Sequence, residues 1–277
     1  MNLERIHWEN WARACRCEQG GLVLILVADV GPRILWFGRA GGPNLLYRDA
    51  TDFAVGSWRM YGGHRLTVAP ESPASYEADN QPCELTSSDD RVTALAPPTA
   101  GGLQREITIG PSRDGHGFEI RHRLHNAGAL PIGAAPWAIT CVPASGRIVV
   151  DWGSGTPGWR TNMIRFWSRV GDHAARLDSP QWRFDNDALT VEPTGERAKI
   201  GLFSARGRAV VTYAGETFIK TAPPVAAEFC YPDGGCNVEV YTCQDYLEIE
   251  TLGPQACIPP GGSVVHVEEW TLGSRGQ

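Results

Sequence analysis

The sequence contains very little lysine and no concentration of positive charge. Lys199 and Lys220 are its two lysines, so nearly all of its 25 basic residues are arginine, and the formal net charge is −6. A nucleic-acid-binding surface needs grouped Lys and Arg to neutralise phosphates, and no such group is present. We therefore expect no nucleic acid partner, and the scarcity of lysine makes each of the two a residue of interest.

Cysteine pairs with metal-binding spacing are also absent. None of the eight cysteines forms a C-x-x-C pair, and Cys15 with Cys17 has no matching pair elsewhere in the 277 residues. A structural zinc site and a disulfide framework both require such pairs. We expect free thiols, most of them buried.

No hydrophobic run approaches the roughly 20 residues that a membrane span needs. The longest, at 22–30, is interrupted by Asp29 and is typical of a buried strand. The first 18 residues mix charged residues with tryptophan and lack the basic-then-apolar order of a signal peptide. These features predict a cytoplasmic protein with no membrane partner.

Three common catalytic motifs are missing as well. The chain has no glycine-rich phosphate loop, no G-x-S-x-G and no H-E-x-x-H. Their absence argues against most nucleotide-dependent enzymes, against serine hydrolases with a nucleophile elbow, and against zinc proteases. We expect no cofactor.

What the sequence does contain is a regular series of short alternating segments. Each spans roughly five to ten residues and ends at Gly, Pro, Asn or Asp, which is typical of strands and turns. No segment shows sustained helical periodicity, apart from a possible single turn at 50–57. We predict an all-β protein, a sandwich or barrel forming one domain over 1–277. The predicted strands are 22–30, 33–38, 104–109, 118–125, 132–142, 147–152, 198–203, 209–213, 238–241, 246–251 and 263–272.

The most informative segment is 246–251, because it places two acids on one face of a strand. Alternation puts Glu248 and Glu250 together, about 7 Å apart along the strand, with Leu247, Ile249 and Thr251 on the other face. Two carboxylates on one face can hold protons, hydroxyl groups or a cation if that face lines a cleft. The structural alternative is a strand with one face in water.

A second segment combines paired glycines with titratable and hydrogen-bonding groups. Gly62 and Gly63 precede His64 and Arg65, and Glu71 follows. Paired glycines permit positive φ or close approach of the backbone to another surface. The histidine and the arginine are either a site or an ordinary surface or core pair. Downstream, the loop 76–80 adds further polar side chains, among them Asp79.

Further candidate residues lie in the second half of the chain. Alternation places Lys220 with Phe218 on one side of a strand, where the lysine is either functional or extends along the ring into solvent. The segment 231–235, with Tyr231 and Asp233, is a turn or a ligand-binding loop. Ten tryptophans are present, and most should be core, but one or two in a cleft would stack on a sugar ring.

Taken together, several motifs resemble those of a bacterial family of unknown function that belongs with the galactose mutarotase-like proteins. The likeness extends from about residue 36 to residue 272. It rests on Gly-Gly-His-Arg-Leu with Ala-Pro-Glu (62–71), Asp-Asn-Gln-Pro (79–82), Ala-Pro-Trp-Ala-Ile-Thr (135–140, with Trp137), Phe-Ile-Lys (218–220), Tyr-Pro-Asp-Gly (231–234), Leu-Glu-Ile-Glu-Thr-Leu-Gly-Pro (247–254), Pro-Gly (260–261) and Glu-Glu-Trp (268–270). The resemblance implies the large twisted antiparallel β-sandwich, or supersandwich, of the aldose 1-epimerases, with a sugar bound on its concave face.

The resemblance also implies roles for individual residues. Aldose 1-epimerases open and reclose a pyranose ring with a glutamate as base and a histidine as acid, and Glu250 matches that glutamate. Arg65 matches the sugar-binding arginine. The acid departs from the pattern, because the corresponding run 136–140 contains no histidine. Either His64 or Lys220 has taken over proton donation, or the reaction is different or absent.

Three functions from different classes follow. The first is an aldose 1-epimerase-like isomerase acting on a sugar or sugar acid by proton transfer. The second is a carbohydrate-binding protein without catalysis, and the third is a glycoside hydrolase or lyase with Glu71 and Glu250 as its acid pair. The spacing demands no metal, although Glu248, Glu250 and Asp233 could hold a hard cation. We expect a small-molecule carbohydrate as ligand, and a monomer or a homodimer. The residues expected to contact it are Arg65, Glu71, Asp79, Trp137, Tyr231, Asp233 and Glu248.

Overall fold

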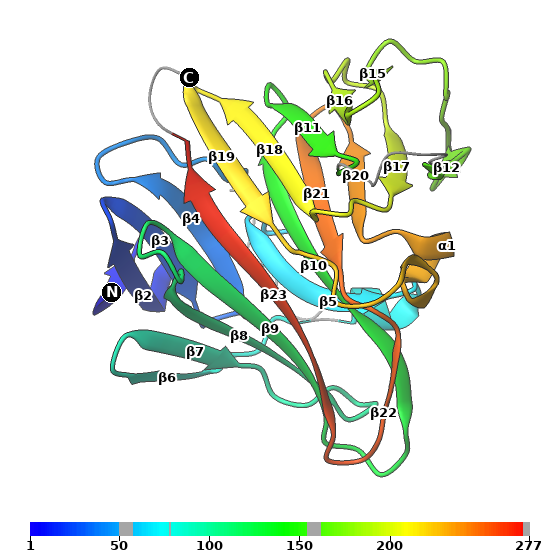
Figure 1. Cartoon of the computed structure of the whole chain (residues 1–277). Coiled ribbons are helices and arrows are strands. Elements are labelled where there is room, and N and C mark those ends of the chain that lie inside the picture. The colour runs from blue at the N-terminus through cyan, green and yellow to red at the C-terminus, as the bar shows by residue number, and fades with distance from the viewer. Residues whose placement is uncertain (50–57, 78, 154–161, 274–277) are drawn as a thin grey trace.

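The structure is a computed structural model that describes residues 1–49, 58–77, 79–153 and 162–273. Strand makes up 54% of it and helix 4%, and two large antiparallel sheets pack face to face (Figure 1). The predicted all-β sandwich is therefore confirmed. The helix considered at 50–57 lies outside the described residues. Among the described residues, no helix is both long and apolar enough to cross a membrane.

The larger sheet carries the features that matter most for function. Its strand order is β1-β2-β3-β4-β5-β10-β21-β20-β17-β12, with β22 paired to β10, and every pairing is antiparallel. The bounds are β1 Asn2–Trp8, β2 Trp11–Gln19, β3 Leu22–Val27, β4 Arg33–Arg39, β5 His64–Ala69, β10 Ile132–Pro143, β12 Ile164–Trp167, β17 Ala198–Leu202, β20 Val238–Thr242, β21 Tyr246–Leu252 and β22 Ala256–Ile258.

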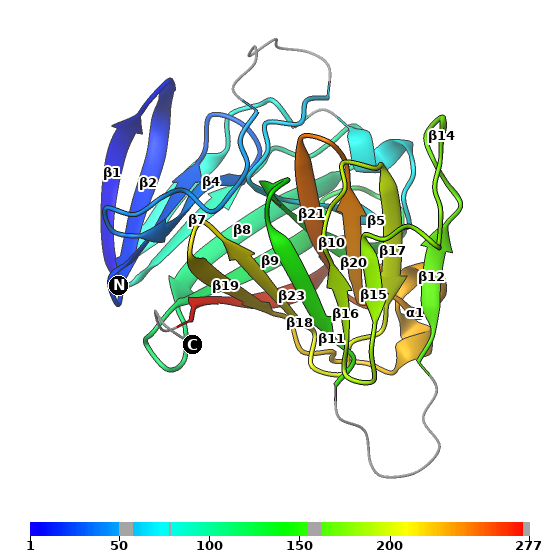
Figure 2. The same cartoon turned by 90° about the horizontal axis from the view of Figure 1, so that it is seen from above.

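The second sheet has the order β15-β16-β11-β18-β19-β23-β9-β8-β7-β6. Its strands are β6 Glu84–Ser88, β7 Arg91–Leu95, β8 Leu103–Pro111, β9 Phe118–Asn126, β11 Arg147–Asp151, β15 Trp182–Phe184, β16 Ala188–Val191, β18 Arg208–Tyr213, β19 Glu216–Thr221 and β23 Ser263–Leu272. A separate hairpin, β13 Arg169–Val170 with β14 His173–Ala174, lies beside β12 and β17, at the end of the molecule opposite β1 and β2 (Figure 2). The helical segments are short: η1 Pro73–Tyr76, η2 Glu228–Cys230 and α1 Pro232–Gly235.

The main core lies between the two sheets and includes a group of aromatic rings. Phe37 from the larger sheet meets Phe218 and Trp270 from the second at ring-centroid distances of 4.9 and 5.2 Å. Phe118 packs edge-on to Phe37 at 6.2 Å. Edge-to-face and tilted rings at these distances add to the stabilisation from burial. The alternation predicted along 118–125 is confirmed, with Phe118, Ile120 and Leu124 buried.

The paired glycines before β5 behave as their sequence predicts. Gly62 and Gly63 have φ of 77° and 66°. A Cβ on Gly63 would lie 2.2 Å from the carbonyl oxygen of Ile34, and one on Gly62 would lie 2.4 Å from that of Tyr47. Any side chain would clash with the backbone there, so the glycines allow β5 to enter the sheet beside β4.

The structure also contains strands that the sequence analysis did not predict. These are the two N-terminal strands, β5 to β7, β12 to β16 and β22. Several are short, and β6 and β1 lie at sheet edges with mostly exposed side chains. Alternation between apolar and polar residues is weak where neither face is well buried, as in β6, or where both faces are, as in β5.

Candidate functional site

The candidate site lies on the face of the larger sheet that points away from the second sheet. It is built from residues that are direct partners across neighbouring strands. Arg65 of β5 pairs with Ile139 of β10, which pairs with Glu250 of β21, which pairs with Glu239 of β20. Directly opposed residues of antiparallel strands share a face. The backbone register therefore sets this row of side chains, although its members are far apart in sequence.

A second row runs beside the first, two residues along each strand. Glu248 pairs with Cys141 on one side and with Tyr241 on the other, and Tyr241 pairs with Lys199. The predicted placement of Glu248 and Glu250 on one face is thus confirmed. Lys199 lies beside them because β17 is the next strand but one from β21.

Most members of the two rows form the floor of a pocket of about 270 Å³, whereas Glu239 and Cys141 do not line it. Both carboxylates, Arg65 and Lys199 line it, and Glu71 contributes from the segment after β5. The lining is rich in aromatic side chains, which are Trp58, Tyr76, Trp137, Tyr241 and Tyr246. A few charged side chains at the base of a hollow lined with aromatic residues are typical of a small-molecule binding site.

Glu250 is buried at the base of this pocket and is held by two donors on one oxygen. Its Oε2 accepts hydrogen bonds from Trp137 Nε1 at 2.6 Å and from Lys199 Nζ at 2.8 Å. Its Oε1 is buried and has no hydrogen-bond partner within the described residues. The carboxylate is therefore fixed in orientation with one oxygen unused, and Trp137, predicted to contact a ligand, also positions this group.

Lys199 joins Glu250 to a second buried acid. Its Nζ lies 2.7 Å from Glu239 Oε2 and over the ring of Trp137, 4.5 Å from the centroid. Burial disfavours the ammonium, but the charges of Glu250 and Glu239 outweigh it and raise the pKa of Lys199. At Gly201, the partner of Glu239 on β17, a Cβ would lie 3.0 Å from Glu239 Cγ, so glycine makes room for that side chain.

Glu248 differs from Glu250 in being partly buried and less constrained. Burial raises its pKa from 4.5 to about 7, and the negative charge of Glu250 adds to the effect. The charges of Arg65 and Lys199 oppose the shift. The Glu248 side chain therefore titrates near neutral pH, where one carboxyl group can both donate and accept a proton.

This raised pKa predicts a pH-dependent stability effect. The folded state holds a proton on Glu248 up to about pH 7, whereas the unfolded chain releases it near 4.5. The stabilisation present at low pH is therefore lost as pH rises through this window. We expect Glu248→Gln to have a higher Tm than the natural protein at pH 8, with little difference at pH 4.5, as measured by thermal unfolding. An equal Tm at both pH values would contradict the shift.

Two other predicted ligand residues, Arg65 and Glu71, also line the pocket. The Arg65 guanidinium lies 5.0 Å from the centroid of the Trp58 ring, which fixes its plane beside the hollow. Glu71 is exposed and accepts a hydrogen bond from the hydroxyl of Tyr76. Glu71 and Glu250 thus border one hollow, as the hydrolase hypothesis requires.

Three of the predicted ligand residues do not line this pocket. Asp79 instead accepts hydrogen bonds from Arg33 on both carboxylate oxygens, at 2.8 and 2.9 Å. Tyr231 is buried, and its hydroxyl accepts a hydrogen bond from the Val225 backbone. Asp233 lies in α1 with a φ of 55°, so the turn interpretation of 231–235 describes its backbone best.

The prediction that His64 or Lys220 acts as proton donor beside Glu250 is not supported, because both residues lie on the opposite side of the larger sheet from Glu250. His64 is fully buried between the sheets, and so is Lys220 of β19. The expectation that His64 and Glu250 meet in one hollow is therefore wrong. His64 and Arg65 are consecutive in β5, so their side chains necessarily point to opposite faces.

Between the sheets these two residues belong to an inter-sheet polar cluster. Its members come from both sheets and are His64, Thr140, Thr251, His122, Lys220, His266 and Glu268. Lys220 Nζ lies 3.0 Å from Glu268 Oε1 and donates to the backbone oxygen of Ile249 at 3.1 Å. Although burial alone would raise it, the charge of Lys220 lowers the pKa of Glu268. Lys220 is thus a buried ion-pair partner rather than a snorkelling surface lysine.

The hydrogen bonds of this cluster fix the state of its imidazoles. Lys220 can only donate, so Thr140 Oγ1 accepts from it at 2.7 Å and donates its own proton to His64 Nδ1 at 2.9 Å. His122 Nδ1 lies against a backbone oxygen and must donate, so His122 Nε2 accepts from His64 Nε2 at 2.7 Å. Both rings are neutral in this scheme, and burial lowers the pKa of each.

The described residues contain one group of side chains close enough to act together as metal ligands, and it lies in this cluster. It consists of His64, His122 and Glu268. The combination of Glu248, Glu250 and Asp233 considered from the sequence is not such a group. In the inter-sheet cluster the Nε2 atoms of His64 and His122 are hydrogen-bonded to each other, Glu268 accepts from Thr251 and Trp270, and the ammonium of Lys220 neutralises Glu268. These contacts favour a structural role.

Sequence reasoning missed several residues of the pocket. Lys199 and Glu239 are the most important, since they hold Glu250 from neighbouring strands. The scarcity of lysine was a usable signal for Lys199, whereas Glu239 requires knowledge of the strand register. Other lining residues, among them Trp58, Tyr76 and Arg197, come from loops and strand ends outside any recognised motif.

Comparison with solved structures identifies the same fold in several bacterial proteins. A galactose mutarotase-like protein from Lactobacillus casei superimposes with a TM-score of 0.64 at 9% identity, over 94% of this chain and 100% of that one. A putative aldose 1-epimerase from Escherichia coli K12 gives 0.62 at 13% identity, covering 93% and 98%. A putative mutarotase from Salmonella typhimurium gives 0.56 at 14% identity, covering 99% and 97%.

No protein-family model and no curated protein sequence matches this chain. The likeness therefore resides in the fold, which is the galactose mutarotase-like β-sandwich over nearly the whole chain. At these identities the fold does not by itself assign an activity, which has to be argued from the site.

Proposed function

We propose that this protein binds a carbohydrate in the Glu248–Glu250 pocket and catalyses proton transfer at its anomeric centre, as in mutarotation. The observation that carries the proposal is the pair of carboxyl groups at the base of an aromatic-lined hollow, one of them with a pKa of about 7. The galactose mutarotase-like fold supports the choice of a sugar as ligand.

The two carboxyl groups take complementary roles in ring opening. Glu250 accepts the proton of the anomeric hydroxyl at Oε1, the oxygen that has no partner in the described chain. As this hydroxyl oxygen becomes a carbonyl, the bond from C1 to the ring oxygen breaks, and that oxygen takes a proton from neutral Glu248. Rotation about the C1–C2 bond and reversal of both transfers close the ring as the other anomer.

The geometry of one strand face suits this reaction. Both reacting oxygens are attached to the same carbon, so a base and an acid on the same side of the sheet can reach them together. Lys199 and Trp137 hold the Glu250 carboxylate in place through Oε2. Arg65, Glu71 and the aromatic side chains line the same pocket, which supports roles for the first two in holding other hydroxyl groups and for the rings in stacking on the sugar.

The direct test is anomer exchange followed by NMR. A panel of aldoses and their uronic acids is equilibrated, and exchange between α and β signals is measured with and without protein at pH 6.5. We expect at least one sugar to exchange well above its spontaneous rate, and a surface variant such as Glu84→Gln to behave like the natural protein. Exchange at the spontaneous rate across the panel would overturn the proposal.

The proposal also predicts a pH profile. Glu248 donates only when protonated, and its pKa is about 7. We therefore expect kcat/KM for exchange to fall as pH rises above about 7, by about tenfold per pH unit. The measurement is the exchange rate between pH 6 and 9, corrected for the buffer reaction. A rate that is flat or rises across this range would exclude Glu248 as the acid.

A second candidate function is carbohydrate binding without turnover. The full burial of Glu250 and its two hydrogen bonds favour it, because a carboxylate so engaged serves well as a rigid support. Calorimetric titration with the same panel separates the two functions. Binding accompanied by spontaneous exchange rates alone would favour this candidate over mutarotation.

A further inference from the structure

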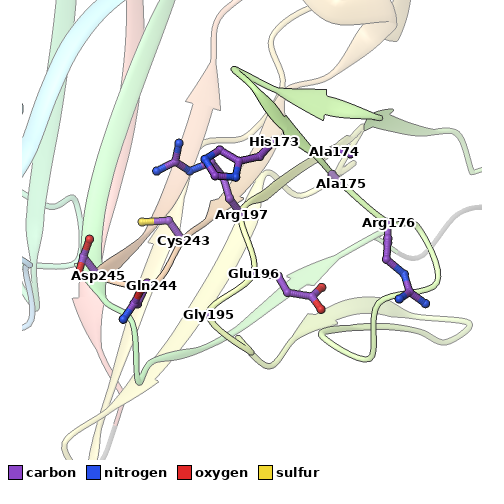
Figure 3. Close-up of a pocket in the computed structure, with 10 residues that line it drawn as sticks. All are labelled: His173, Ala174, Ala175, Arg176, Gly195, Glu196, Arg197, Cys243, Gln244 and Asp245. Carbon is purple, nitrogen blue, oxygen red and sulfur yellow. The ribbon is translucent and has the colours of Figure 1, made fainter.

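A second and larger hollow lies next to the Glu248–Glu250 pocket. It has a volume of about 460 Å³ and is bounded by three chain segments (Figure 3). These are the turn 243–245 between β20 and β21, the segment 195–197 before β17, and residues 173–176, which begin with β14. Figure 3 shows Asp245 and Gln244 on one side of the hollow and Arg176 on the other.

Each of these segments contributes residues to the lining of both hollows, either itself or through residues next to it in the chain. Arg197 lines both of them. In the hairpin β13–β14, Val170 and Gly171 line the Glu248–Glu250 pocket, while His173 lines the second hollow. At the start of β21, Tyr246 lines the pocket and the preceding Asp245 lines the second hollow. Arg197 is therefore a wall that the two hollows share.

The second hollow offers hydrogen-bonding groups of both charges. The side chains of Arg197, Gln244 and Asp245 are exposed, and none of them forms a hydrogen bond with another described residue. Arg176 and Glu196, by contrast, are engaged by Asp178 at 3.0 Å and by Ser179 at 2.5 Å. The positive charge of Arg197 and the negative charge of Asp245 offset each other, and the Gln244 amide is neutral.

Such a lining fits a neutral polyhydroxylated group better than a phosphate. A phosphate would be drawn to grouped cations, and Asp245 would repel it. Hydroxyl groups both donate and accept, so they satisfy Arg197, Asp245 and Gln244 at the same time. Among the described residues, no Phe, Tyr or Trp lines the second hollow, which makes hydrogen bonding its main means of recognition.

We propose that the two hollows form one cleft for a neutral saccharide of at least two rings. The reducing ring lies over Glu248 and Glu250, and the next ring lies beyond Arg197, where it bonds to Gln244 and Asp245. The placement of the reducing ring rests on the proposed function. The volumes agree, because the first pocket is of the size of one ring and the second has room for more.

The experiment compares single sugars with disaccharides that share their reducing ring. Glucose and galactose are titrated beside maltose, cellobiose and lactose by calorimetry, and anomer exchange is measured in the same samples. We expect at least one disaccharide to bind about tenfold or more tightly than its monosaccharide, because its second ring adds hydrogen bonds to a charged group. Equal affinities throughout would overturn the cleft.

A double variant tests which residues give the preference. Gln244→Ala with Asp245→Ala removes two of the free groups, and we expect it to reduce the ratio of disaccharide to monosaccharide affinity toward one. Glu84→Ala with Thr86→Ala, on the exposed side of the far edge strand β6, is the matched control and should keep the ratio. A ratio unaffected by the first variant would also overturn the proposal.

The two proposals fail separately in this design. If monosaccharides exchange rapidly but disaccharides bind no more tightly, the cleft is wrong and the proposed reaction stands. If no sugar exchanges but disaccharides still bind preferentially, the reaction is wrong and the cleft stands. Thermal unfolding of each variant checks that the altered turn leaves the fold intact.

Discussion

Glu250→Gln is expected to reduce anomer exchange by about 100-fold or more while the protein remains folded. General acid–base groups contribute on the order of 10² to 10⁴ in rate, and an amide cannot accept the proton of the anomeric hydroxyl. The variant keeps the shape of the side chain, and its amide oxygen can still accept from Trp137 and Lys199 at the position of Oε2. The measurements are NMR exchange rates and the Tm.

The matched control for this variant is Glu239→Gln. Glu239 is also buried and also paired with Lys199, yet it does not line the pocket. We expect it to cost far less exchange activity than Glu250→Gln. Similar losses in both variants would indicate that the negative charge around Lys199 matters rather than proton transfer by Glu250. Unchanged exchange in Glu250→Gln would remove the base assignment.

The second large effect concerns stability and lies in the inter-sheet polar cluster. Lys220→Met leaves Glu268 buried without its cation, since Lys220 and Glu268 are both fully buried and 3.0 Å apart. Removing one partner of a buried ion pair costs about 3–5 kcal/mol in free energy of unfolding. Urea denaturation should show a loss of this size, and a loss under about 1 kcal/mol would contradict the buried pair.

A double variant then distinguishes a structural role of Lys220 from a catalytic one. Lys220→Met with Glu268→Gln removes both charges, and we expect it to recover much of the lost stability. If Lys220 supplied the proton for ring opening, as one interpretation of the sequence held, this double variant would fold but not exchange anomers. We expect it to exchange, because Lys220 lies on the other side of the sheet from the pocket.

The alternation of single strands was the part of the site that the sequence could predict. Glu248 and Glu250 share a face in the structure as the 246–251 pattern requires. The same rule applied to 64–69 separates His64 from Arg65, but the segment was not recognised as a strand because all its residues are buried and no alternation shows. Without that strand assignment, the sequence gives no reason to place His64 and Arg65 on opposite faces.

The pairing and register of strands that are distant in the chain could not be predicted from the sequence. Lys199, Glu239 and Glu250 meet because β17, β20 and β21 pair in one register, and no local pattern encodes that register. The contact of Arg33 with Asp79, 46 residues apart, is another case. The motif predicts Asp79 as a ligand residue, whereas in the folded chain Asp79 accepts hydrogen bonds from the buried guanidinium of Arg33.

The location of the floor residues within paired strands has a consequence for specificity. Arg65, Glu248 and Glu250 are carried by strands with neighbours on both sides, so moving any of them would mean breaking ladder hydrogen bonds across the sheet. The surrounding rim, by contrast, comes from a two-stranded hairpin and from turns, which tolerate insertion and substitution. Substitutions in the rim can thus change which ligands fit the pocket, while the positions of the floor residues stay the same.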